Sequence, residues 1–134
     1  MSLETTIEQV EGDAPLTILA LDGELDASNF EGLIDTVRRL YDGGTRRLLI
    51  DLADLRFMAS SGLVALHSIV RIMHGEPPPD PEAGWSALHA DVGPGQTEVQ
   101  LCGPQPAVER VLSRTGLDQL FTVHADRDAA LAAR

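Results

Sequence analysis

The chain of 134 residues contains no lysine, and its ten basic residues are all arginines, against 21 aspartates and glutamates. The formal net charge is therefore -11. This balance argues against a nucleic-acid groove and against docking on an anionic membrane, because both rely on clustered Lys and Arg. Basic or mixed-charge protein surfaces remain as the natural partners.

Cysteine is almost absent, since Cys102 is the only one in the sequence. A single thiol forms no intrachain disulfide and builds no cysteine-based zinc site, which is compatible with a reducing compartment. The first residues show no basic region followed by an apolar run, as a secretory signal would. No apolar stretch is long enough to cross a bilayer. We therefore expect a cytoplasmic protein without membrane insertion.

Motifs of catalysis and metal binding are missing as well. The sequence has no G-x-S-x-G elbow, no Walker loop and no dinucleotide fingerprint. His67 and His74 are seven residues apart, whereas metal-binding pairs on a helix are usually three or four apart, so we expect a solvated helix face there. Cys102 follows a predicted strand with no histidine near it in the sequence, which favours a buried, inert thiol. We expect no enzyme, no cofactor and no metal site.

What the chain does contain is an alternation of short apolar runs and helical stripes. Apolar runs predict strands over 5–10, 16–21, 47–52, 98–102 and 121–123. Helices are predicted to start at Ser28, at Ser60, near Pro104 to Pro106, and after Asp126 as a cap. A strand–helix–strand order normally means parallel strands with a right-handed crossover. The sequence thus predicts an α/β sandwich with at most a short antiparallel edge at the front.

The first helix has the clearest signals. Ser28 and Glu31 form an S-x-x-E capping box, and Gly43-Gly44 is placed to end the helix. The predicted buried stripe comprises Phe30, Leu33, Ile34, Val37, Leu40 and Tyr41.

Residues 76–96 interrupt the alternation. They contain five prolines and several glycines between a helix and a strand, which are usually joined by about 2–6 residues. We interpret them as a Pro/Gly-rich loop inserted into a single domain that spans 1–134. Trp85 and Leu88 in this loop are expected to pin it to the body, with a contact patch as the alternative.

The most informative segment is 51–66, DLADLRFMASSGLVAL. A strand ends, Phe57 and Met58 are expected to anchor the loop, and Ser60 is placed as the N-cap of a helix. The amides and dipole of a helix start attract anions, so a phosphate on Ser60 would add about two negative charges without breaking the helix. Taken by itself, the local pattern favours a plain capping serine.

This segment resembles the STAS domain of anti-anti-sigma factors, in which a strand ending in D-L is followed by F-[IM]-D-S-S-G-L. LDGELDA at 21–27 is similar to the family's G-E-L-D turn, and LCGPQPAVERVLSRTGLDQLF at 101–121 is similar to its later strand–helix–strand segment. The resemblance covers most of the chain outside 76–96. It implies an α/β STAS fold, with a mixed, mostly parallel sheet of four to five strands and about four helices.

The resemblance also implies a function, that of an anti-sigma factor antagonist. Its partner would be an anti-sigma factor with a GHKL-type serine kinase domain, and the first serine of the motif, Ser60, would be the phosphorylated residue. The implied partner-binding residues are Asp26, Ala59, Ser60, Ser61, Gly62, Leu63 and His67. Ala59 stands where the family has an aspartate, so Ser60 can accept a phosphate while the charge beside it is missing. No direct contact with nucleic acid is implied, and homodimerisation is left open.

Two other functions are compatible with the sequence. One is an accessory STAS subunit of a lipid or anion transporter, which needs no phosphorylated serine and tolerates Ala59. The other is the sensing of a ligand such as a nucleotide at the start of the Ser60 helix. The second is weaker, because Arg56 is the only basic residue near that position.

Overall fold

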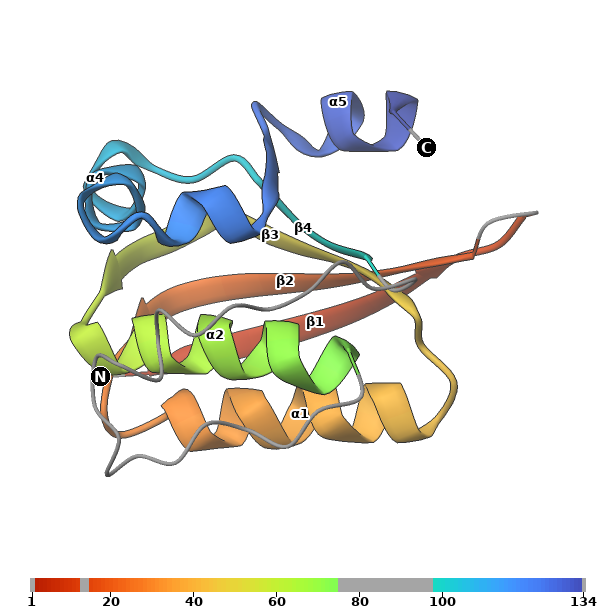
Figure 1. Ribbon diagram of the computed structural model, residues 1–134, viewed down its shortest axis with the longest axis horizontal. Coiled ribbons are helices and arrows are strands. Elements are labelled where there is room, and N and C mark those ends of the chain that lie inside the picture. The colour runs from red at the N-terminus through yellow and green to blue at the C-terminus, as the bar shows by residue number, and fades with distance from the viewer. Residues whose placement is uncertain (1, 13–14, 75–97, 134) are drawn as a thin grey trace.

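A computed structural model describes residues 2–12, 15–74 and 98–133 of the chain. One five-stranded sheet with the order β1-β2-β3-β4-β5 runs through it (Figure 1). The strands are β1 (Leu3–Val10), β2 (Leu16–Leu25), β3 (Arg47–Met58), β4 (Glu98–Cys102) and β5 (Thr122–His124). Strand β1 is antiparallel to β2 and the other three pairings are parallel. The predicted mostly parallel sheet with an antiparallel front edge is confirmed.

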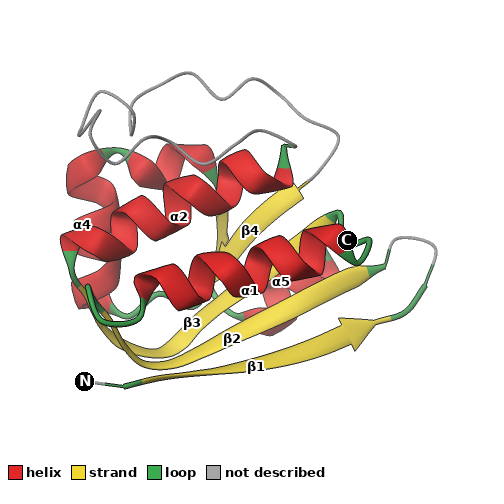
Figure 2. Cartoon of the chain, turned by 90° about the horizontal axis from the view of Figure 1, so that it is seen from below, coloured by secondary structure: helices red, strands yellow, loops and turns green. Residues whose placement is uncertain are grey.

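Four α-helices and one short 3-10 helix accompany the sheet in the described residues. They are α1 (Phe30–Asp42), α2 (Ser60–Met73), α4 (Pro106–Thr115), η2 (Leu117–Leu120) and α5 (Arg127–Ala132). Helices α1 and α2 lie side by side over one face of the sheet, and α5 lies on the other face (Figure 2). None of the described helices is long and apolar enough to span a membrane.

The two faces of the sheet differ in how well they are covered. The main core lies between the first face and helices α1, α2 and α4, and it confirms the α1 stripe, with Leu33 and Val37 fully buried. A smaller cluster on the second face is formed by Leu16, Ile18, Leu49, Cys102 and Ala130. Ala130 belongs to the short helix α5, so within the described part of the chain this helix covers the second face near the start of β2.

Strands β2 and β3 run well past their predicted ends, because their last residues divide between a buried and an exposed side. In β3, Leu52, Leu55 and Met58 are buried, and two exposed residues separate each from the next. The β2–β3 register shifts twice in this stretch, as at a β-bulge, and such a pattern of mixed burial cannot be seen in an uninterrupted apolar run. The predicted limits at residues 21 and 52 therefore marked the ends of the apolar runs and not of the strands.

Helix α1 begins later than predicted, at Phe30, with Asn29 as its N-cap residue. The predicted capping by Ser28 is wrong, because the Asp26 carboxylate accepts hydrogen bonds from both the backbone N–H and the hydroxyl of Ser28. Aspartate commonly forms such a turn with the residue two positions on. The predicted stop at Gly116 is confirmed by its left-handed φ of 74°.

The cap predicted for the last helix is confirmed too, because Asp126 Oδ1 accepts from the Ala129 N–H at 2.8 Å. The inserted loop predicted over 76–96, with Trp85 and Leu88, lies outside the described residues.

Candidate functional site

The carboxyl ends of β2 and β3 bring two loops together at one edge of the sheet. Leu25 and Met58 are partners in the parallel β2–β3 register, and the Ala59 N–H donates to the Leu25 carbonyl at 2.9 Å. Asp26 follows one strand directly and Ser60 follows the other after a single residue. The structure therefore places the β2–α1 loop and the start of α2 side by side, and we call this edge the strand-end site.

Ser60 is the first residue of α2 and is exposed. The prediction that Ser60 is the N-cap is wrong, because Ala59 occupies that position with extended φ and ψ angles of -80° and 172°. Alanine has no oxygen to offer, so the N-cap side chain makes no capping hydrogen bond. The first amides of a helix have no acceptor four residues back, and of these the Gly62 N–H donates to the Ala59 carbonyl at 2.8 Å. The exposed Ser60 hydroxyl thus lies beside a positively polarised, uncapped helix start.

The second serine of the pair is in a different environment. Ser61 is half-buried, and its Oγ is shielded from solvent without a hydrogen-bond partner in the described part of the chain. Of the two neighbouring serines, Ser60 is therefore the exposed one, while the Ser61 hydroxyl is shielded.

Gly62 allows the first turn of α2 to lie directly on the strand ends. A Cβ at this position would clash with Met58 Cγ and would come within 3.1 Å of Leu25 Cγ and Cδ2. Both neighbours are buried, at 4% and 0% exposure. The glycine of the S-S-G sequence therefore has a packing role, because any side chain would push the helix away from β2 and β3.

The remaining predicted contact residues of α2 point inward. Leu63 is 3% exposed and His67 is 0% exposed. The expectation that His67 lies on a solvated helix face is wrong, because α2 is buried on most of its circumference. Of the predicted partner-binding residues, Asp26, Ala59, Ser60 and Ser61 have surface exposure at the strand-end site, whereas Gly62, Leu63 and His67 lie beneath it.

Asp26 is held in place by its own loop. The Asn29 side chain accepts from the Asp26 N–H at 3.0 Å and donates to the Glu24 carbonyl at 2.8 Å. Hydrogen bonds from the Ser28 hydroxyl and then from the Ser28 N–H hold the pKa of the Asp26 carboxyl below its usual value. Asp26 therefore contributes a fixed negative charge to the strand-end site at neutral pH.

Phe57 is a surface residue that the sequence analysis missed. It was expected to anchor the loop together with Met58, but only Met58 is buried, while Phe57 is 44% exposed. Neighbouring residues of a strand point to opposite faces, so burying one exposes the other. Phe57 is the register partner of Glu24, on the second face of the sheet. This alternation was the signal that could have identified it.

The site offers a contact surface and a hydroxyl group, and we find no cluster of metal ligands among the residues that the structure describes. Arg56, the nearby basic residue, contacts Asp22 at 3.4 Å. Cys102 is far along the sheet and fully buried as predicted, and burial raises the pKa of its thiol to about 12.

The STAS domain family model matches residues 5–74, which include both loops of the strand-end site. The chain belongs to the STAS domain family. A curated relative of this STAS protein is a candidate anti-sigma factor antagonist, BtrV of Bordetella bronchiseptica, 25% identical over 131 residues, which are 98% of this chain and 94% of BtrV.

Solved structures share the STAS fold over nearly the whole chain. An anti-sigma factor antagonist from Mycobacterium paratuberculosis superposes with a TM-score of 0.69 and 24% identity, over 98% of this chain and 93% of that one. The STAS domain of a SulP transporter from Vibrio cholerae superposes with a TM-score of 0.64 and 19% identity, over 92% and 83%. These likenesses confirm the predicted fold.

Proposed function

We propose that this STAS protein is an anti-sigma factor antagonist that acts by binding, without catalysis of its own. It binds an anti-sigma factor with a GHKL-type serine kinase domain through the strand-end site, and it is switched by phosphorylation of Ser60. Release of a sigma factor from the captured anti-sigma factor then regulates transcription in the cytoplasm. The relative named as an anti-sigma factor antagonist supports the partner class.

The observation that carries the proposal is an exposed serine at an uncapped helix start. Ser60 is exposed and the helix has no side-chain cap, while its neighbour Ser61 keeps its Oγ shielded from solvent. A phosphate with about two negative charges is favoured next to free helix amides. Ser60 can therefore carry a phosphate in the folded protein without loss of the helix.

The effect on binding follows from the cost of an unpaired charge. When the unphosphorylated protein binds, the Ser60 hydroxyl is covered by the partner. A phosphate at the same place would bring buried negative charge into the interface, and such a charge is costly unless the partner pairs it. Asp26, already ionised in the adjacent loop, adds to the repulsion of any acidic partner group.

The test compares binding and phosphorylation with a GHKL-type anti-sigma protein from the same genome. Wild type and Ser60→Ala should bind, and Ser60→Asp should bind at least about tenfold more weakly because its charge lies in the interface. Incubation with ATP should add about 80 Da to wild type and to Ser61→Ala but not to Ser60→Ala. Equal binding by Ser60→Ala and Ser60→Asp would refute the switch.

Ala59 favours one alternative, a STAS subunit of a lipid or anion transporter that is not phosphorylated. The likeness to the SulP domain is at 19% identity and shows the fold alone. A transporter gene beside this one, together with no mass increase in the kinase reaction, would support the alternative.

A further inference from the structure

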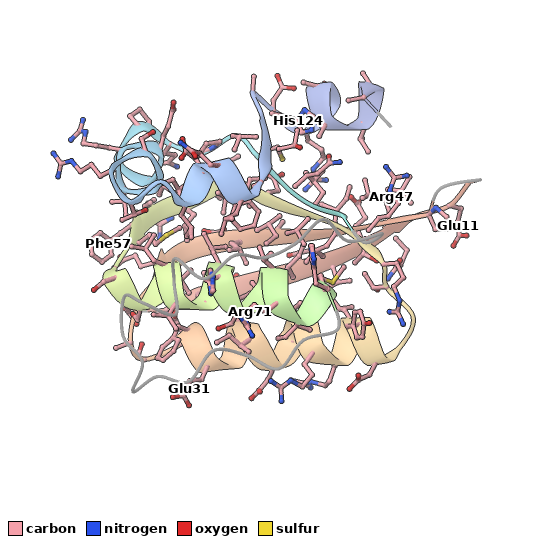
Figure 3. The ribbon with its side chains drawn as sticks, in the orientation of Figure 1. Glu11, Glu31, Arg47, Phe57, Arg71 and His124 are labelled. Atoms are coloured by element: carbon pink, nitrogen blue, oxygen red, sulfur yellow. The ribbon has the colours of Figure 1, made fainter. Side chains whose placement is uncertain are left out.

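The exposed side chain of Phe57 lies outside both apolar cores. Three large hydrophobic side chains of the described residues are exposed, namely Ile7 at 47%, Phe57 at 44% and Val123 at 42%. Phe57 belongs to neither of the core clusters found in the described residues. Its side chain projects from the end of β3 at the edge where α2 begins (Figure 3). It thus adjoins the strand-end site but faces the other side of the sheet.

Acidic residues surround Phe57 on this part of the second face. Glu4, Asp22 and Asp54 are register partners across β1, β2 and β3, and all three are exposed. Residues that are directly opposite in a sheet lie on the same face. The surface that we call the Phe57 face comprises Glu4, Asp22, Glu24, Asp54, Arg56 and Phe57.

Helix α5 leaves this surface uncovered. Ala130 packs on Leu16, Ile18 and Leu49, near the start of β2 and β3, whereas the Phe57 face lies at their ends. The Phe57 face carries the exposed carboxylates of Glu4, Asp22 and Asp54 and the half-buried one of Glu24, whose Oε2 is shielded from solvent, against the single guanidinium of Arg56. A second copy of this acidic chain would meet it with like charges, so the complementary occupant is a basic protein surface.

We propose that the anti-sigma partner extends around the sheet edge onto the Phe57 face, where an apolar side chain packs on Phe57 and basic side chains lie opposite the carboxylates. This rests on the proposed function and adds a second contact to it. The first turn of α2 has no acidic residue that could pair with a basic partner. The Phe57 face would supply the charged contact that this helix start lacks. Aromatic anchors next to a desolvated centre often dominate binding.

The two other exposed hydrophobic residues supply matched controls. Dissociation constants with the GHKL-type anti-sigma protein are measured for the full chain and for Phe57→Ala, Ile7→Ala and Val123→Ala. Phe57→Ala should weaken binding at least about tenfold, and the two controls by less than about twofold. Circular dichroism checks the fold of each variant, and Phe57→Leu, which keeps an apolar contact, should lose less affinity than Phe57→Ala.

The charges are tested through the association rate. The double variant Glu4→Gln/Asp54→Asn should associate more slowly and depend less on salt than wild type, because both carboxylates would face basic groups. Glu31→Gln, on α1 and exposed, serves as the control. If wild type binds and Phe57→Ala binds as tightly as Val123→Ala, this second contact is refuted and the proposed function stands. If wild type does not bind at all, both proposals fall.

Discussion

Replacing Gly62 with alanine tests the close packing on which the strand-end site is built. Alanine is better than glycine in a helix interior by about 0.8–1 kcal/mol. At Gly62, however, the new Cβ would clash with Met58 Cγ and lie 3.1 Å from Leu25 Cγ. Such overpacking costs about 1–3 kcal/mol. We expect Gly62→Ala to lower the free energy of unfolding by about 1 kcal/mol net, the difference of the two effects.

Gly32 in α1 is the matched control, because a Cβ there meets no atom within 4 Å. Gly32→Ala should raise the free energy of unfolding by about 0.5–1 kcal/mol. Urea denaturation measures both variants, and an unchanged slope assigns the difference to stability. In a double-mutant cycle, truncating Met58 to alanine should make Gly62→Ala less harmful. If Gly62→Ala stabilises as much as Gly32→Ala, the contact of α2 with the strand ends is looser than the 3.1 Å distance to Leu25 requires.

Three further predictions concern single groups. Ala59→Asp and Ala59→Asn should each raise the free energy of unfolding by about 1 kcal/mol, because Ala59 has the extended backbone of an N-cap residue but no side-chain oxygen. Urea titrations at pH 7 and pH 3 should show that only the Asp variant loses this added stability in acid. Ser28→Ala should raise the pKa of Asp26 part of the way toward its ordinary value of 3.8, measured by NMR titration, because the variant loses the hydrogen bond from the Ser28 hydroxyl, the larger cause of the lowered pKa, and keeps the one from the backbone N–H. Burial, and then the charge of Asp51, raise the pKa of the Cys102 thiol from 9.0 to about 12. The thiol therefore ionises at a lower pH in the unfolded chain than in the folded one, so the free energy of unfolding should fall as pH rises from 9 toward 12. Cys102→Ala should make that fall less steep. A Cys102→Ala variant with the same alkaline slope as wild type would contradict the last of these.

The elements that the sequence predicted well are those that bury an apolar face. Strand β4 was predicted over 98–102, and it spans those residues. The α1 stripe also packs as its spacing predicts, because a period of 3.6 residues places its apolar side chains on one face. In such segments the structure depends on burying apolar side chains, and the spacing of those side chains can be recognised in the sequence.

The details that the sequence did not predict depend on competition between local hydrogen bonds. Ser28 was a good capping residue, but the Asp26 carboxylate binds it first and the helix starts two residues later, at Phe30. Ser60 lost the cap position to Ala59 because the backbone, and not a side chain, makes the turn there. Both outcomes depend on which acceptor lies within hydrogen-bond distance of an N–H group in the folded chain, and the order of residues alone does not give that distance.

The neighbourhood of Asp26 and Ser60 was predictable, because parallel strands end at the same edge of a sheet. The exposure of Phe57 was not predicted, because Phe57 and Met58 were both expected to be buried as anchors of the loop. Phe57 and Met58 turn to opposite faces, so Met58 enters the main core and Phe57 is exposed on the second face, beyond the part that helix α5 covers.

Packing at the start of α2 limits how a phosphate on Ser60 could act. Gly62 lies against Leu25 and Met58, and the Ala59 N–H is bonded to the Leu25 carbonyl, so the first turn is fixed to the sheet. A phosphate that is favoured by the uncapped helix amides adds no force that would move this turn. The partner must then respond to the charge itself, and a charge buried in the interface is screened by salt much less than an exposed one. Loss of binding by Ser60→Asp should accordingly be nearly the same at low and high ionic strength, and the circular dichroism spectrum of the free variant should match that of wild type, whereas a switch by refolding would change that spectrum.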